Sequence, residues 1–284
     1  MGKTNKSIGT RMRGYEYVTR THLPRRIPAI IRVDGKAFHS FTKGLRKPFD
    51  DFFRNIMQLT MQYMCENVQG CVFGYTQSDE ISLLLTDYET IATDAWFDYT
   101  IQKMCSVAAS MATLAFNKFW AEEFQAQIEH WEREDDGTMD EETEKWVWEY
   151  LVNTIQPKLF TAMFDARTFS IPKDEVCNYF IWRQQDATRN SIETVGQTYF
   201  SQKDLNGRAQ NEIQEMLWQQ HSINWNTYPI AYKRGVCCSK VLRETPMENP
   251  RNPGKEIVVA RRKWVIDREP PIFTQDREYV EKKI

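Results

Sequence analysis

The chain has 284 residues, of which 41% are hydrophobic and 13% aromatic. This composition excludes an intrinsically disordered chain and supports a sizeable core, in one large domain or two small ones. No apolar run approaches the roughly 18 residues of a membrane span, and the polar N-terminus carries no secretory signal. We therefore expect a cytoplasmic protein with no membrane partner. The six cysteines show no Cys-x-x-Cys pair, which disfavours zinc and indicates reduced thiols.

The net charge of −2 hides an uneven distribution of charged residues. Residues 121–149 hold 12 acidic and 2 basic residues, a net charge of −10, which leaves +8 for the rest of the chain. A positive remainder has the sign expected for a polyanionic partner. Residues 1–26 hold seven Lys and Arg residues against one Glu and are predicted to be a flexible, basic lead-in. This segment could contact RNA phosphates, or it could be a solvated tail.

Hydrophobic periodicity predicts an α+β core. Alternating apolar residues over 27–34 indicate a strand, and the i, i+3, i+4 spacing over 49–65 indicates a helix packed on the sheet. A hairpin is predicted over 70–86, a second helix over 94–119 and a strand over 164–171. Together they give a β-α-β-β-α-β order, the ferredoxin-like arrangement, which hosts many different functions.

The remaining segments are predicted to surround this core. Residues 121–158 would form an acidic arm of two helices, whose tryptophans indicate either a subunit interface or packing back on the core. Further helices are expected over 172–185 and 202–221, and strands over 225–241 and 256–266. The predicted organisation is a lead-in (1–26), a core (27–120 with 159–190), an arm (121–158) and a C-terminal region (191–284).

Acidic residues stand at the ends of two predicted strands. Asp34 closes the first strand before a turn at Gly35, and Asp79 lies in the polar tip of the hairpin between Ser78 and Glu80. If the strands are adjacent, Asp34 and Asp79 converge and can hold Mg²⁺, which prefers hard oxygen ligands and substrate phosphates. Two such ions would align an attacking oxygen and stabilise a leaving pyrophosphate. The alternative is that Asp-Gly is an ordinary turn and Ser-Asp-Glu only caps the hairpin.

Five short segments follow one another in a specific order. They are residues 32–41 (RVDGKAFHSF), 74–82 (GYTQSDEIS), 164–167 (FDAR), 182–186 (WRQQD) and 229–235 (PIAYKRG). Together they resemble the tRNA-His guanylyltransferases and their tRNA-repairing relatives. The resemblance implies a palm domain similar to those of polymerases and nucleotide cyclases, with an inserted helical arm and a C-terminal α/β extension. It also implies a nucleotidyltransferase that adds nucleotides in the 3′–5′ direction to the 5′ end of tRNA.

The resemblance assigns roles to individual residues. Asp34, Asp79 and the backbone carbonyl of Gly35 would bind two Mg²⁺ ions, with Glu80 as a further acidic candidate in catalysis. ATP, GTP and other nucleoside triphosphates would be held by Lys36, Ala37, Phe38, His39, Lys47, Ser78 and Lys103. The tRNA would be contacted by Arg183, Asp186, Arg189, Asn190, Lys233 and Arg234. The family also implies a homotetramer, although the enlarged arm could change the contacts and leave a dimer.

One segment departs from the family pattern. The guanylyltransferases proper carry a His-Ile-Asn-Asn segment where residues 188–191 read Thr-Arg-Asn-Ser, so that Thr188 replaces the histidine and Ser191 the second asparagine. This resembles the bacterial and archaeal branch, which is associated with template-directed repair of 5′-truncated tRNA. The alternatives are addition of the single 5′ guanylate to tRNA-His, a palm-type nucleotide cyclase that needs no RNA, and a non-catalytic RNA-binding scaffold.

Overall fold

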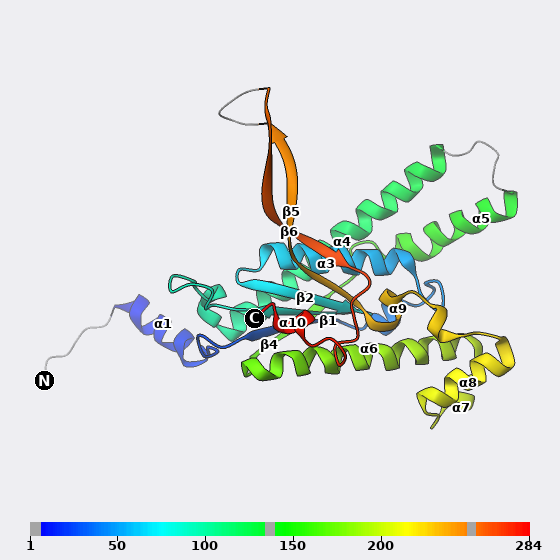
Figure 1. Cartoon of the computed structure of the whole chain (residues 1–284), viewed down its shortest axis with the longest axis horizontal. Coiled ribbons are helices and arrows are strands. Elements are labelled where there is room, and N and C mark those ends of the chain that lie inside the picture. Colours follow the sequence, from blue (N-terminus) through cyan, green and yellow to red (C-terminus); the bar gives the residue numbers. More distant parts are fainter. Residues whose placement is uncertain (1–6, 134–139, 249–253) are drawn as a thin grey trace, which may run out of the picture.

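A six-stranded antiparallel sheet forms the centre of the computed structural model, which describes residues 7–133, 140–248 and 254–284. The strand order is β4-β1-β3-β2-β5-β6 (Figure 1). The strands are β1 (Ala29–Gly35), β2 (Cys71–Gln77), β3 (Glu80–Leu85), β4 (Phe164–Ser170), β5 (Val236–Glu248) and β6 (Glu256–Asp267). The predicted first strand, the hairpin and the strand after the arm therefore form as expected.

Helices cover both faces of the sheet. Helices α3 (Asp51–Asn67) and α4 (Ile101–Arg133) lie on one face, and α6 (Val176–Tyr199) lies on the other (Figure 1). Successive side chains of a strand point to opposite faces, so in β1 Ile31 packs in the cluster under α3 and α4, whereas Ile30 packs in the cluster under α6. The unbroken apolar run of Ala29, Ile30 and Ile31 follows from this burial on two sides.

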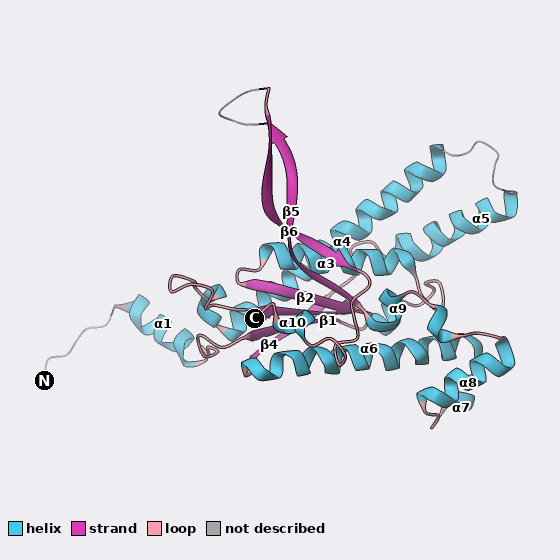
Figure 2. Cartoon of the chain, viewed as in Figure 1, coloured by secondary structure: helices cyan, strands magenta, loops and turns pink. Residues whose placement is uncertain are grey.

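The remaining helices are short, and two pairs of elements extend away from the body. Figure 2 shows that the β5–β6 hairpin projects from the body and that the arm, formed by the end of α4 and by α5, projects separately. The remaining helices are α1 (Ile8–Val18), α2 (Phe38–Phe41), α5 (Glu141–Tyr150), α7 (Gln202–Leu205), α8 (Gln210–His221), α9 (Ile230–Arg234) and α10 (Glu278–Glu281). Single turns lie at Trp96–Tyr99, Leu151–Ile155, Gln156–Lys158, Lys173–Glu175 and Trp225–Thr227. None of the helices in the described residues combines the length and the apolar composition of a membrane span.

Three predicted elements differ from the structure. The strand predicted over 225–241 is wrong in its first part, because residues 230–234 form α9 and β5 begins only at Val236. Gly235 stops this helix with a φ of 78°, a conformation that glycine adopts without steric cost. The helix predicted over 172–185 continues to Tyr199, and the helix predicted to end at residue 119 continues to Arg133, because no Pro or Gly interrupts either helix at the predicted end.

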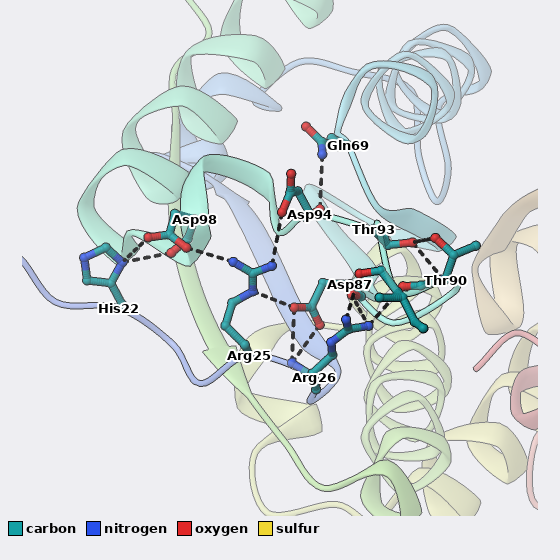
Figure 3. Close-up of polar contacts among 10 residues, drawn as sticks. His22, Arg25, Arg26, Gln69, Asp87, Thr90, Thr93, Asp94 and Asp98 are labelled. Carbon is teal, nitrogen blue, oxygen red and sulfur yellow. Dashed lines mark hydrogen bonds and ion pairs between the residues drawn. The ribbon is translucent and has the colours of Figure 1, made fainter.

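The basic lead-in is also more ordered than predicted. It contains the helix α1, and its last two arginines are bound to the loop that follows β3 (Figure 3). The fully buried carboxylate of Asp87 accepts hydrogen bonds from Nε of Arg25 at 2.8 Å and from the backbone N–H of Arg26 at 2.9 Å. The Arg25 guanidinium also contacts Asp94 and Asp98. Arg25 and Arg26 are thus occupied within the fold and do not form part of an open RNA-binding surface.

We expect Asp87→Ala to destabilise the protein by about 2 kcal/mol, because it removes charge-assisted hydrogen bonds from a buried site. Urea unfolding monitored by circular dichroism measures this free energy. The matched control is Asp94→Ala, which removes only the exposed contact to Arg25 at 3.5 Å and should cost less than about 0.5 kcal/mol. Equal effects of the two substitutions would contradict the assigned role of the buried carboxylate.

Candidate active site

Two carboxylates meet at one end of the sheet. Strand β1 lies between β3 and β4, and this pairing places Asp34 opposite Glu80 on one side and Asp165 on the other. Asp79 occupies the tight turn between β2 and β3, where Ser78 adopts a left-handed φ of 49°. The backbone N–H of Gly35 donates to the carbonyl oxygen of Asp79 at 3.1 Å. The structure therefore brings the ends of the first strand and the hairpin together, as the sequence predicted.

This end of the sheet carries excess negative charge. Burial raises the pKa of Asp79, and the neighbouring charge of Asp34 raises it further, against opposing hydrogen bonds from its own backbone and from Ser78. Arg167 lies close to this pair, with Nη2 3.7 Å from a carboxylate oxygen of Asp34 and 3.3 Å from one of Asp165. Its guanidinium is half exposed, so it only partly offsets the repulsion between the carboxylates.

The oxygen donors at this site fit Mg²⁺. Within residues 7–133, 140–248 and 254–284, no three or more His, Cys, Asp and Glu side chains are grouped to hold a metal ion. Mg²⁺ commonly uses only one or two carboxylates and completes its shell with water and substrate phosphate. Asp34 and Asp79 offer two such carboxylates. Burial is the main cause of the raised pKa of Asp79, and the smaller contribution from the charge of Asp34 is of the kind that a divalent cation relieves.

Glu80 is engaged differently from the two aspartates. It is buried, and one carboxylate oxygen lies 2.9 Å from Nε of Arg183 and 3.3 Å from the hydroxyl of Ser82. Burial raises the pKa of Glu80, whereas the charges of Arg183 and Arg32 lower it. Its carboxylate is therefore committed to a buried ion pair between the sheet and α6.

A cavity of about 730 Å³ lies beside the carboxylates. The tip of β2, the loop before α3, and the helices α3, α6 and α9 form its walls. Among the predicted nucleotide and tRNA contacts, His39, Lys47, Ser78 and Asn190 line this cavity. Its volume is in the range of sites that hold small-molecule ligands.

Several cavity residues were not predicted as ligand contacts. Arg54 and Gln58 line the cavity from α3, which the sequence analysis treated only as a helix of the core. They lie four residues apart on one side of that helix, directly after a basic loop, and this i, i+4 polar pair is the signal that could have identified them. Arg46 and Tyr232 also line the cavity, and the Arg54 guanidinium lies 3.9 Å from the centre of the Tyr232 ring.

Known proteins share this fold and sequence over most of the chain. Residues 9–172 match the family model described as tRNAHis guanylyltransferase. The chain belongs to the tRNA-His guanylyltransferase family. A bacterial tRNA(His) guanylyltransferase-like protein solved in complex with ATP is 37% identical and covers 98% of this chain and 99% of its own, with a TM-score of 0.77. The structure of such a bacterial protein in complex with GTP is 38% identical, with the same coverage and a TM-score of 0.72.

More distant members of the guanylyltransferase family are also similar. A probable tRNA(His) guanylyltransferase from Dictyostelium discoideum is 26% identical over 263 residues, which cover 86% of this chain and 90% of the relative. The tRNA(His) guanylyltransferase of Schizosaccharomyces pombe is 25% identical over 240 residues, 78% of each chain. The chain is therefore a nucleotidyltransferase of this family that acts on tRNA, with a mixed helical and antiparallel sheet fold.

Some residues that the guanylyltransferase resemblance suggested as nucleotide contacts lie elsewhere. Lys103 is at the start of α4, where its ammonium lies 4.4 Å from the centre of the Phe97 ring. This part of α4 is hydrogen bonded to Thr21, near the opposite end of β1 from Asp34. Because a strand rises about 3.3 Å per residue, the two ends of this seven-residue strand are separated by about 20 Å. The structure does not bring Lys103 to the carboxylates.

The nucleotide contacts predicted at residues 36–39 differ in their exposure to solvent. Phe38 is buried, and its ring packs against Phe164 with centroids 4.9 Å apart, so it belongs to the core. Ala37 is exposed and adopts a φ of 58° at the turn that follows β1. Lys36 and His39 are exposed near Asp34, and His39 reaches the cavity.

Several of the predicted tRNA contacts are buried or paired within the fold. Arg183 is only 5% exposed and binds Glu80 and Asp186, and Lys233 is 7% exposed and donates to the carbonyl of Asn226 at 2.6 Å. Arg234 is half-buried, and its backbone carbonyl accepts a hydrogen bond from the Tyr75 hydroxyl at 2.8 Å. Asp186 also pairs with the exposed Arg189. Among the predicted tRNA contacts on α6, Arg189 is exposed at the surface and Asn190 lines the cavity.

Thr188 and Ser191, which differ from the family pattern, form side-chain hydrogen bonds within the fold. The hydroxyl of Thr188 donates to the carbonyl of Gln184 at 3.0 Å, one turn earlier in α6. The buried hydroxyl of Ser191 accepts a hydrogen bond from the indole of Trp225 at 3.0 Å. Ser191 also borders the cavity, so the departure changes one wall of the space beside the carboxylates.

We expect Arg183→Met to destabilise the enzyme by about 3 kcal/mol, because it leaves Glu80 buried without its cation. The free energy of unfolding in urea measures this effect. Arg189→Met is the matched control, since Arg189 is exposed on the same helix and its ion pair should contribute less than about 1 kcal/mol. A fully stable Arg183→Met protein with weakened tRNA binding would instead support the original assignment of Arg183 to RNA.

Proposed function

We propose that this enzyme repairs 5′-truncated tRNA by adding templated nucleotides in the 3′–5′ direction. The observation that carries the proposal is the Asp34 and Asp79 pair beside a nucleotide-sized cavity with basic residues in its wall. Relatives more than 35% identical have been solved with ATP and with GTP, which supports nucleoside triphosphates as substrates. Thr188, in place of the family histidine, favours the repair reaction over addition of a single guanylate to tRNA-His.

The proposed metal site uses both aspartates and the backbone carbonyl of Gly35 for two Mg²⁺ ions. When bound, Mg²⁺ would neutralise phosphate charge and stabilise the charge that develops on the oxygens during transfer. The residues of the chain would then orient the substrates so that the reacting atoms are aligned. Lys47, His39 and Ser78 line the adjacent cavity and are proposed to hold the triphosphate.

The proposed reaction consists of two transfers. The 5′-monophosphate of the tRNA first attacks the α-phosphorus of ATP or GTP and releases pyrophosphate. The 3′-hydroxyl of the incoming nucleoside triphosphate then attacks the activated 5′-phosphate and releases the nucleoside monophosphate. Positioned cations and hydrogen-bond donors are expected to provide most of the rate enhancement, because both steps develop negative charge on phosphate oxygens.

The proposed architecture is a ferredoxin-like palm. The β-α-β-β-α-β element order and the strand order β4-β1-β3-β2 support this interpretation. We assign the catalytic core to residues 27–120 and 159–190, the arm to 121–158, the lead-in to 1–26 and the C-terminal region to 191–284. We further propose a homotetramer or dimer, with the tryptophan-rich arm as a candidate interface.

The β5–β6 hairpin is the proposed surface for tRNA phosphates. Its register places Arg243 opposite Arg261, with Lys263 diagonal to Arg243 on the same face. All three are exposed, and no carboxylate in the described part of the chain forms an ion pair with any of them. Like charges directly opposite one another are destabilising in a sheet, and a phosphate backbone would relieve that repulsion. These residues replace the buried Arg183 and Lys233 as candidate phosphate contacts.

The reaction is tested by incubating the enzyme with Mg²⁺, all four nucleoside triphosphates and two tRNAs. One is tRNA-His without its additional 5′ guanylate, and the other is a non-His tRNA that lacks its first nucleotide. We expect templated restoration of the truncated non-His tRNA. Addition to tRNA-His alone would show a dedicated guanylyltransferase, and a cyclic nucleotide formed without RNA would show a cyclase.

We expect Asp79→Asn to lower nucleotide addition by about 100-fold or more, because loss of a ligand removes several kcal/mol of charge stabilisation. The same variant should melt at a higher temperature than the wild type at neutral pH without Mg²⁺. Since burial raises the pKa of Asp79, the folded state binds this proton more tightly than the unfolded state does. Folded stability therefore falls as pH rises from the ordinary carboxyl pKa through the raised value.

Circular dichroism melting curves measure the melting temperature, and an assay of nucleotide addition to 5′-truncated tRNA measures the activity. Mg²⁺ should raise the melting temperature of the wild type and leave that of Asp79→Asn unchanged. Wild-type activity in a folded Asp79→Asn protein would refute the assignment of Asp79 as a ligand.

We expect the triple substitution Arg243→Gln, Arg261→Gln and Lys263→Gln to weaken tRNA binding uniformly across tRNA sequences. If each cation contacts one phosphate, the negative slope of log affinity against log salt concentration should become shallower by about 2 to 3. Filter binding at several salt concentrations measures this slope. An unchanged slope would exclude the hairpin from the RNA interface.

A further inference from the structure

The base of the acidic arm touches the wall of the nucleotide cavity. Tyr150 is the last residue of α5 and is largely buried, and its hydroxyl donates a hydrogen bond to the carboxylate of Asp50. These residues are 100 positions apart in the sequence. Asp50 lines the cavity beside the carboxylates. The contact therefore joins the arm directly to the proposed substrate site.

Asp50 holds the loop that precedes α3. One carboxylate oxygen accepts from the backbone N–H of Arg46 at 2.9 Å, and the other accepts from the backbone N–H of Phe53 at 2.9 Å and caps the helix. Lys47, proposed to contact the triphosphate, lies between Arg46 and Asp50 in this loop. Burial raises the pKa of Tyr150, and the bond to Asp50 raises it further, so the hydroxyl stays a donor at neutral pH.

The arm also holds the side chain of Arg46. The Arg46 guanidinium lies 4.5 Å from the centre of the Tyr150 ring and 4.7 Å from that of Trp146, one turn earlier in α5. Arg46 lines the cavity. No carboxylate among the described residues forms an ion pair with it. Two aromatic faces restrict the orientation of the guanidinium without using its hydrogen-bond donors. Those donors remain available for a phosphate.

We propose that the acidic arm positions the nucleotide-binding loop, with Tyr150 and Trp146 as positioning residues for Arg46, Lys47 and Asp50. This inference rests on the proposed role of the cavity in binding nucleoside triphosphate. The arm carries negative charge, yet its base presents two aromatic rings and a hydroxyl to the loop, so it strengthens binding of a polyanion by ordering cations. Any partner that moves α5 would then change the affinity for nucleotide.

The test compares Tyr150→Phe, Trp146→Ala and the control Trp148→Ala. Trp148 lies on the same helix, and its ring packs on Trp131 with centroids 4.6 Å apart rather than on Arg46. Equilibrium dialysis gives the Kd for Mg·ATP without tRNA, and steady-state addition gives KM and kcat. We expect Tyr150→Phe to raise Kd and KM about tenfold through loss of a hydrogen bond to a charged group. Trp146→Ala should raise them about threefold, and kcat should stay unchanged.

A double-mutant cycle with Arg46→Ala separates positioning from general destabilisation. Trp146→Ala should have no further effect once Arg46 is absent, because its effect acts through that guanidinium. Trp146 is 54% exposed, so we expect Trp146→Ala to fold. The cycle with Trp146→Ala therefore remains decisive if circular dichroism shows that Tyr150→Phe does not fold. Kd values for both variants equal to that of Trp148→Ala, or a fall in kcat with unchanged KM, would overturn the inference.

The binding measurement separates this inference from the proposed function. A wild-type enzyme that binds Mg·ATP but restores no tRNA would refute the repair reaction, and the effect of the arm on Kd would still stand. A wild-type enzyme that binds no Mg·ATP would refute both.

Discussion

The pairing of β1 between β3 and β4 is the constraint on which the site depends. In this register the end of the first strand lies against the hairpin turn, so that Asp34 and Asp79 cannot move apart without loss of sheet hydrogen bonds. Two carboxylates held together in this way repel each other. Burial raises the pKa of Asp79, and the charge of Asp34 adds a smaller increase in the same direction. The fold therefore tolerates local repulsion where a cation is expected to bind.

Helices on both faces of the sheet contribute to the cavity. Helices α3 and α4 bury one face, and α3 contributes Arg54 and Gln58 to the cavity at its edge. On the other face, α6 buries an ion pair between Glu80 and Arg183. Buried pairs of this kind tend to fix one arrangement rather than add net stability. Here the pair fixes α6, whose Asn190 lines the cavity wall.

The strands and the carboxylate pair could be predicted from the sequence because both depend on local patterns. Alternating apolar residues define β1, and the polar tip of a hairpin places Asp79 at its turn. The position of Lys103 could not be predicted in this way, because it depends on where α4 begins along the sheet axis. Arg183 and Lys233 look like an ordinary charged surface in the sequence, and only tertiary packing reveals that both are buried. The segment at 225–234 has strand-like residues, yet it forms two helical turns. The second turn, α9, lies between Pro229 and Gly235.

The most direct test of this account is the binding of Mg·ATP and of ATP in EDTA to the wild type and to Asp34→Asn, measured by isothermal titration calorimetry. If the two aspartates hold the metal ions of the substrate complex, the wild type should bind Mg·ATP more tightly than metal-free ATP, and Asp34→Asn should lose that difference. Equal affinities of the wild type for ATP with and without Mg²⁺, or an unaltered difference in Asp34→Asn, would contradict the assignment of this end of the sheet as the catalytic metal site.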